Sequence, residues 1–83
     1  MLTASKFERK SIGEKVNLLY KDGTFIMSIR YYRHKVNLYL LSNFFVEVFY
    51  NHKLDKIDKV DLLDDRHSRM KFYADQIKLS LTI

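Results

Sequence analysis

The chain has 83 residues, a formal net charge of +5, and a composition that is 47% hydrophobic and 30% charged. These values are typical of one small globular domain over residues 1–83 and exclude an intrinsically disordered chain. Because the chain has no cysteine and only two glycines, it has no disulfide framework, thiol nucleophile, cysteine zinc site or glycine-rich phosphate loop.

The apolar segments of the sequence are short. The first ten residues lack the apolar core of a signal peptide. The longest apolar stretch, residues 36–50, is interrupted by polar side chains and falls short of the about 20 apolar residues that a membrane span needs. We therefore expect a cytoplasmic protein with no membrane contact.

The first predicted element is a helix over residues 11–22. Ser11 and Glu14 have the spacing of a capping box, in which each residue satisfies a backbone N–H of the other. Gly23 suits the left-handed position that often follows a helix. Apolar residues recur at helical spacing at Ile12, Val16, Leu19 and Tyr20.

Two features beside this helix leave alternatives open. Asp22-Gly23 is also a strong turn signal, so residues 11–22 have a rival interpretation as part of a hairpin. Ser5 and Glu8 offer a second capping box, so residues 1–10 form either a short helical turn or a flexible arm.

Three strands are predicted next, over residues 24–33, 36–41 and 44–50. The last two are β-branched and aromatic runs joined by Ser42-Asn43, a tight two-residue turn in which Asn43 tolerates a positive φ. The cluster Arg33-His34-Lys35 is the predicted turn between the first two strands. Alternation places these residues of the first strand on one face: Phe25, Met27, Ile29 and Tyr31. Ile57, Lys59 and Asp61 likewise share a face if residues 56–63 form a strand.

Residues 56–77 have two interpretations. In one, a strand ends near Leu63 and a helix runs from about residue 65 to 77, with Asp64-Asp65 as its N-cap. In the other, an unbroken apolar stripe makes a single long helix over residues 56–77. We favour the strand followed by a helix.

The predicted fold class is therefore α+β: an N-terminal helix, a four-stranded antiparallel β-meander and a C-terminal helix. Pairing Leu41 with Phe44 makes both faces of the sheet apolar, with Leu38 on one face and Tyr39 on the other. Each apolar face of the sheet has to be buried against another element. Two short helices can bury one face well and the other only poorly. This predicts a homo-oligomer, most simply a homodimer.

Three segments together resemble a group of small uncharacterised bacterial proteins, known mainly as hypothetical proteins. They are Val36-Asn37-Leu38-Tyr39, Phe44-Phe45-Val46-Glu47-Val48 and Ile57-Asp58-Lys59-Val60. The resemblance covers roughly residues 11–78 and implies a helix, a β-meander and a C-terminal helix. It implies no activity.

Most polar clusters in the sequence indicate a solvated surface. The three histidines, His34, His52 and His67, match no metal-ligand spacing. The acidic residues Asp55, Asp58, Asp61, Asp64 and Asp65 lack the central glycine of a calcium loop. We therefore predict no metal, no cofactor, no catalytic residue and no enzymatic activity.

Glu47 interrupts an apolar run in the middle of a central strand. A buried carboxylate must be paired or protonated, and one register places Glu47 on the same face as Arg30 and Lys59. We interpret Glu47 as a structural ion-pair residue or an exposed position.

The basic charge is concentrated in the first half of the chain, where residues 1–40 carry eight Lys/Arg against three Asp/Glu. At the first hairpin, cations alternate with aromatic rings, which suits phosphate contacts and base stacking. The predicted nucleic-acid contacts are Arg30, Tyr32, Arg33, His34 and Lys35. The sequence thus predicts a non-enzymatic homo-oligomeric interaction module, with a nucleic-acid-binding accessory protein as the alternative.

Overall fold

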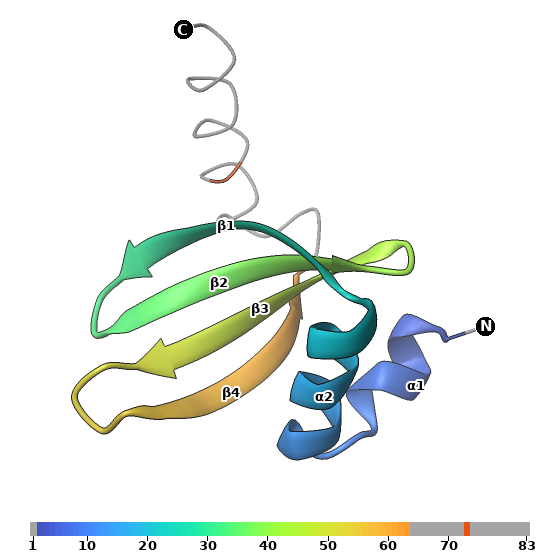
Figure 1. Cartoon of the computed structure of the whole chain (residues 1–83), viewed down its shortest axis with the longest axis horizontal. Helices are drawn as coiled ribbons and strands as arrows, with labels where there is room; N and C mark the ends of the chain where they lie inside the picture. The colour runs from blue at the N-terminus through green and yellow to red at the C-terminus, as the bar shows by residue number, and fades with distance from the viewer. Residues whose placement is uncertain (1, 64–72, 74–83) are drawn as a thin grey trace, which may run out of the picture.

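The computed structural model describes residues 2–63 and residue 73. Two helices precede four strands that pair in chain order as one antiparallel sheet, so the fold is α+β with a β-meander (Figure 1). The elements are α1 (Ala4–Glu8), α2 (Ile12–Asp22), β1 (Thr24–Tyr31), β2 (His34–Leu41), β3 (Phe44–Asn51) and β4 (Lys56–Leu63).

Helix α2 begins where the capping box predicted. The Glu14 N–H donates to the Ser11 hydroxyl at 3.2 Å, and the Ser11 N–H donates to the Glu14 carboxylate at 3.1 Å. Helix α1 is a short helical turn over residues 4–8, one of the two forms that the sequence left open for residues 1–10. Its cap is Thr3 rather than Ser5, since the Thr3 hydroxyl accepts from the Lys6 N–H at 3.2 Å.

Gly23 ends α2 in a way that the sequence did not predict. Its φ is −80° and its ψ is 155°, which is extended and not left-handed. A Cβ at this position would lie 2.6 Å from the Leu19 carbonyl oxygen. Glycine is therefore needed for a close approach of two backbone segments, and the Gly23 N–H donates to that carbonyl at 2.9 Å.

The first turn is shorter than the sequence predicted, whereas the second is the predicted two-residue turn Ser42-Asn43. His34 and Lys35 belong to β2, where they pair with Tyr31 and Arg30 of β1, so the first turn is Tyr32-Arg33. In the second turn the positive φ of 56° belongs to Ser42 and not to Asn43.

Residues 56–63 form a strand, so the single long helix over residues 56–77 is wrong for this part. The predicted helix over residues 65–77, its Asp64-Asp65 cap and His67 lie outside the described residues, apart from Tyr73.

Two irregularities in register change which residues share a face. Between Phe25 and Met27 the pairing shifts, so that Phe25 lies opposite Tyr39 while Met27 lies opposite Leu38. The expected common face of Phe25 and Met27 is therefore wrong. A second shift lies beside Asp58 and moves Ile57 opposite Tyr50, on the other face from Lys59. Each bulge adds one residue and reverses the alternation beyond it.

The sheet has two different faces, as the confirmed pairing of Leu41 with Phe44 requires. We call the face that carries Tyr39, Val46 and Val48 the first face, and the face that carries Leu38 and Glu47 the second face. Helices α1 and α2 pack on the first face through a core of Phe7, Leu19, Leu41, Val46, Val48 and Val60.

The second face has its own core. Tyr73 is 1% exposed and packs with Leu38 and Leu63. Partly buried residues complete this cluster: Ile26, Met27, Ile29 and Phe45. Neither helix among residues 2–63 has the length and apolar character that crossing a membrane requires.

Candidate binding groove

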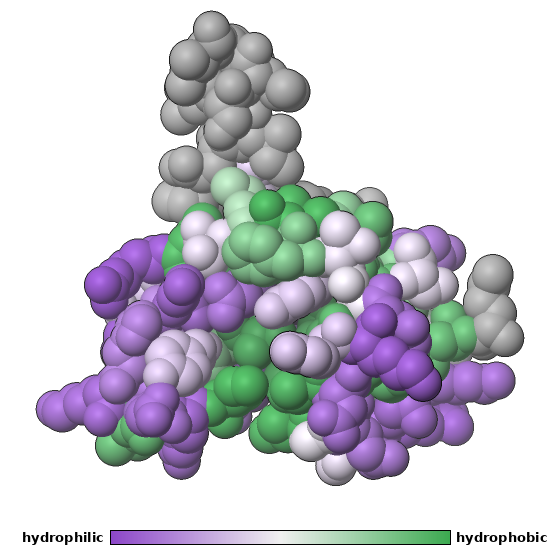
Figure 2. Space-filling view, viewed as in Figure 1, coloured by the Kyte–Doolittle hydropathy of each residue, from purple (hydrophilic) through white to green (hydrophobic). Residues whose placement is uncertain are grey.

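The helices cover only part of the first face. Both lie near the end of the sheet where the β2–β3 turn projects, and the strands extend beyond them toward the β1–β2 and β3–β4 turns (Figure 1). On this side apolar residues remain visible in the middle of the surface, between hydrophilic regions at both ends (Figure 2). The uncovered half of the first face is therefore the candidate site.

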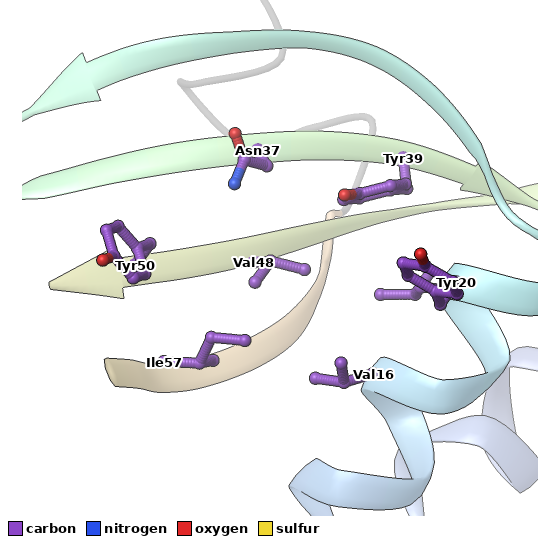
Figure 3. Close-up of a pocket in the computed structure, with 8 residues that line it drawn as sticks. Val16, Tyr20, Asn37, Tyr39, Val48, Tyr50 and Ile57 are labelled. Carbon is purple, nitrogen blue, oxygen red and sulfur yellow. The ribbon is translucent and has the colours of Figure 1, made fainter. Parts of the chain in front are cut away.

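A groove with a volume of about 130 Å³ lies between α2 and the uncovered strands. Its apolar walls come from Val16 and Leu19 of α2 and from Val48 and Ile57 of the sheet. The remaining lining residues are three tyrosines and one amide: Tyr20, Tyr39, Tyr50 and Asn37. Tyr50 lies at one end of the groove and Tyr20 and Tyr39 at the other (Figure 3). We call this the tyrosine groove.

Tyr50 is held in place from two sides. Its hydroxyl donates a hydrogen bond to the Asp55 carboxylate, and its ring meets the His52 ring edge-on at 4.9 Å between centroids. The bond to Asp55 raises the pKa of Tyr50 above its ordinary value of 10.0, with smaller contributions from burial and from the Asp55 charge. Tyr50 is therefore a neutral, pre-oriented ring at physiological pH.

The rings at the other end of the groove differ in exposure. Tyr20 projects from α2 and is 92% exposed, which is unusual for an aromatic residue beside a core. Tyr39 is half-buried, and the Phe25 ring packs against it at 5.6 Å with an interplanar angle of 72°. This end thus offers one free ring and one ring fixed in the sheet.

Two cations lie directly beside the tyrosine groove. Arg30 and Lys35 are opposite each other on β1 and β2, and Lys35 is opposite Tyr50 on β3. They line a second, more open hollow of about 370 Å³ together with Ser28, Ile29 and His52. Within residues 2–63 and 73, neither cation forms an ion pair.

The predicted nucleic-acid contacts lie in three places: on the first face, at the β1–β2 turn and on the second face. Arg30 and Lys35 share the first face, and Tyr32 and Arg33 are exposed at the turn. The Tyr32 ring is 84% exposed and meets Tyr31 edge-on at 4.7 Å. His34 belongs to the second-face side, opposite Tyr31 and Asn51.

His34 is part of a polar cluster with Asp58 and Asn51. The distance from His34 Nε2 to Asp58 Oδ2 is 2.7 Å, and the Asn51 amide donates to the same oxygen at 3.1 Å. The hydrogen bond from His34, followed by the one from Asn51, lowers the pKa of Asp58 below its ordinary value of 3.8. His34 therefore has an intramolecular partner in Asp58, which is also bonded to Asn51 on the other side of the β3–β4 loop.

Glu47 is fully buried on the second face. The Tyr73 hydroxyl donates to Glu47 Oε2 at 2.9 Å. The expected shared face with Arg30 is wrong, because Arg30 pairs with Lys35 on the first face. Lys59 does lie on the second face, where its ammonium group contacts the Asp61 carboxylate at 3.4 Å and lies 4.4 Å from the Phe49 ring centroid.

The three acidic residues of the β3–β4 loop and β4 also have local partners, while Asp64 and Asp65 lie outside the described residues. Asp55 accepts from Tyr50, Asp58 from His34 and Asn51, and Asp61 pairs with Lys59. In the part of the chain that the structure describes, no group of three or more His, Asp and Glu residues is arranged to hold a metal ion.

No protein family, curated protein or solved structure matches this chain. The resemblance to small uncharacterised bacterial proteins stays a prediction.

Proposed function

We propose that this protein is a non-enzymatic single-stranded nucleic-acid-binding protein that uses the tyrosine groove and the adjacent Arg30–Lys35 pair. The observation that carries the proposal is the cation pair. Like charges directly opposite on neighbouring strands destabilise a sheet. Two such cations, exposed and without an ion pair among the described residues, suit an anionic ligand such as a phosphate backbone.

The aromatic residues favour a single strand over a duplex. Binding to single strands combines cations that follow the backbone with rings on which bases stack. Lys35 and Tyr50 are cross-strand neighbours, so a phosphate contact and a stacking ring lie side by side on one sheet face. In a duplex the base faces are already stacked on one another, and the tyrosines have nothing to stack on.

The contact surface in this proposal differs from the hairpin tip. Arg30 and Lys35 remain in the contact set, and Tyr20, Tyr39 and Tyr50 join it. His34 is excluded because it bonds to Asp58 at 2.7 Å. Tyr32 and Arg33 are exposed at the end of the same hairpin and extend the surface without lining the groove.

A fluorescence titration with a short labelled single-stranded oligonucleotide tests the proposal. Each phosphate contact on a single strand contributes a slope of about −0.7 to the salt dependence of log affinity. The Arg30→Ala/Lys35→Ala variant should therefore have a slope that is flatter by about 1.4 units. The matched control is Lys6→Ala/Arg9→Ala, which removes the same charge from an exposed position on α1 and from its exposed C-cap residue.

Three outcomes contradict the proposal. They are no binding at about 50 mM salt, an equal change of slope in the two double variants, and duplex binding as tight as single-strand binding. The last two would indicate a general electrostatic attraction to a basic protein and not a site.

Self-association is the second candidate, and the outer edge of β1 favours it. β1 is an end strand of the sheet, and Phe25 on it is 53% exposed. Among the described residues the outer edge of β1 has no partner strand, and such an edge is a template for pairing with a second copy. The sequence predicted a dimer because the second face would be left exposed. In the single chain this face is already buried, with the following residues at most 2% exposed: Val36, Leu38, Glu47 and Phe49.

Light scattering at micromolar concentration tests this candidate. A dimer through β1 should have about twice the chain mass. Phe25→Lys should return it to a monomer, because a charge on an edge strand opposes edge pairing. A strict monomer at every accessible concentration would exclude it.

A further inference from the structure

Asn37 is the unusual residue of the tyrosine groove. It lies on the central strand β2, opposite Ser28 on one side and Val48 on the other, and it is half-buried. Its side chain lines the groove among apolar and aromatic groups (Figure 3). No hydrogen bond joins the Asn37 amide group to any other of the described residues.

The Asn37 amide is accessible from the groove. No buried side-chain N or O atom among the described residues lacks a hydrogen-bond partner, so the Asn37 amide, which has no such partner, keeps contact with solvent and is available to a ligand. Ligand sites commonly combine apolar walls with a few polar groups that fix the orientation of the ligand. The Asn37 amide, with donors and an acceptor side by side, fits that description.

The groups around Asn37 define what could occupy the groove. The walls are apolar, so the part of the ligand inside is uncharged. The Tyr50 ring is oriented by Asp55 and His52, so that part can stack on a ring. Outside the groove, Lys35 is the cross-strand neighbour of Tyr50, and Arg30 is the next residue across the sheet on β1, so the ligand has an anionic group close to its flat part.

We propose that the tyrosine groove holds one unpaired base of the bound strand, with Asn37 hydrogen-bonded to the edge of that base. This inference rests on the proposed function and adds a base-recognition site to it. A base edge presents adjacent donors and acceptors that an amide side chain matches in two hydrogen bonds. Tyr50 stacks on the base, and the flanking phosphates meet Arg30 and Lys35.

The test compares two labelled strands of equal length and charge, one with bases and one with abasic sites throughout. The native protein should bind the strand with bases at least tenfold more tightly at the same salt concentration. Asn37→Ala should weaken binding of this strand by about tenfold, since its hydrogen bonds to the base are lost. The same variant should leave binding of the abasic strand and the salt slope unchanged.

The control for Asn37→Ala is Asn17→Ala, which removes the same amide from an exposed position on α2 outside the groove. Thermal unfolding of both variants shows that they fold. Asn17→Ala should bind both strands like the native protein.

The outcomes separate the two proposals. Equal affinity for the two strands, or full binding by Asn37→Ala, overturns base recognition in the groove. If base recognition fails but the salt slope still depends on Arg30 and Lys35, the proposed single-strand binding stands without a base site in the groove. If neither strand binds, the proposed function fails and the base site fails with it.

Discussion

The two faces of one sheet treat a polar residue in opposite ways. On the second face, Glu47 is fully buried and accepts a hydrogen bond from the buried Tyr73 hydroxyl. On the first face, Asn37 is half-buried beside a groove, and its amide has no such bond among the described residues. A polar residue satisfied within the chain supports the fold, whereas one left available at a groove is a candidate for binding.

The same contrast holds for charge. The ammonium group of Lys59 on the second face lies over the Phe49 ring and contacts Asp61. On the first face, Arg30 and Lys35 lie directly opposite each other on β1 and β2, so each cation has a second cation as its cross-strand neighbour. The following substitutions test whether one face is built for stability and the other for binding.

The largest effect is expected at Glu47. Glu47→Ala should lower the free energy of unfolding by about 3 kcal/mol, because the buried Tyr73 hydroxyl loses its acceptor and a cavity remains. Glu47→Gln keeps an acceptor oxygen and should cost no more than about 1.5 kcal/mol. Urea denaturation measures both values. A loss below about 0.5 kcal/mol for Glu47→Ala would be the behaviour of a surface residue and would break the comparison.

A smaller effect is expected at the other end of this bond. Tyr73→Phe keeps the ring that packs with Leu38 and Leu63 and removes only the hydroxyl. We expect a loss of about 1 to 1.5 kcal/mol in urea denaturation, the upper part of the range for the net contribution of an intramolecular hydrogen bond. An unchanged stability would mean that the bond to Glu47 contributes nothing to holding Tyr73 on the second face.

Much of the fold could be predicted from local patterns. The Ser11–Glu14 capping box located the start of α2, and the pairing of Leu41 with Phe44 fixed the two faces, because both depend on residues close in sequence. The bulges beside Ile26 and Asp58 could not be predicted, since a bulge is set by packing across strands and leaves no fixed sequence mark.

The candidate site was harder to predict. The sequence marks Arg30 and Lys35 as cations near aromatic rings, but a turn over residues 33–35 does not predict their cross-strand pairing, which follows from the observed turn at residues 32–33. Tyr20 joins the site only through the position of α2 over the sheet. A sequence signal did exist on β2, where Lys35, Asn37 and Tyr39 alternate with the buried Val36 and Leu38.

The polar cluster of Asp58 should make stability depend on pH in acid. Its pKa is lowered in the folded state, first by the His34 bond and then by the Asn51 bond, so the folded state favours the charged carboxylate. This contribution is complete above the ordinary pKa of 3.8, which holds in the unfolded chain, and is lost as the pH falls through the lower folded value. Urea midpoints between about pH 5 and pH 2 should fall less steeply in Asp58→Asn than in the native protein.

The smallest change in stability should accompany the largest loss of binding. Lys35→Glu replaces the like-charge pair with Arg30 by an opposite-charge pair, which should stabilise the sheet by about 0.2–1 kcal/mol. It also places a carboxylate where a phosphate would bind, so single-strand affinity should fall at least tenfold. Lys53→Glu, at an exposed position in the β3–β4 loop, is the charge-matched control. Thermal unfolding and oligonucleotide titration of the two variants then separate the roles of this position. A Lys35→Glu protein that is less stable than the native one would mean that Lys35 supports the fold. The assignment of the first face as the binding face would then be wrong.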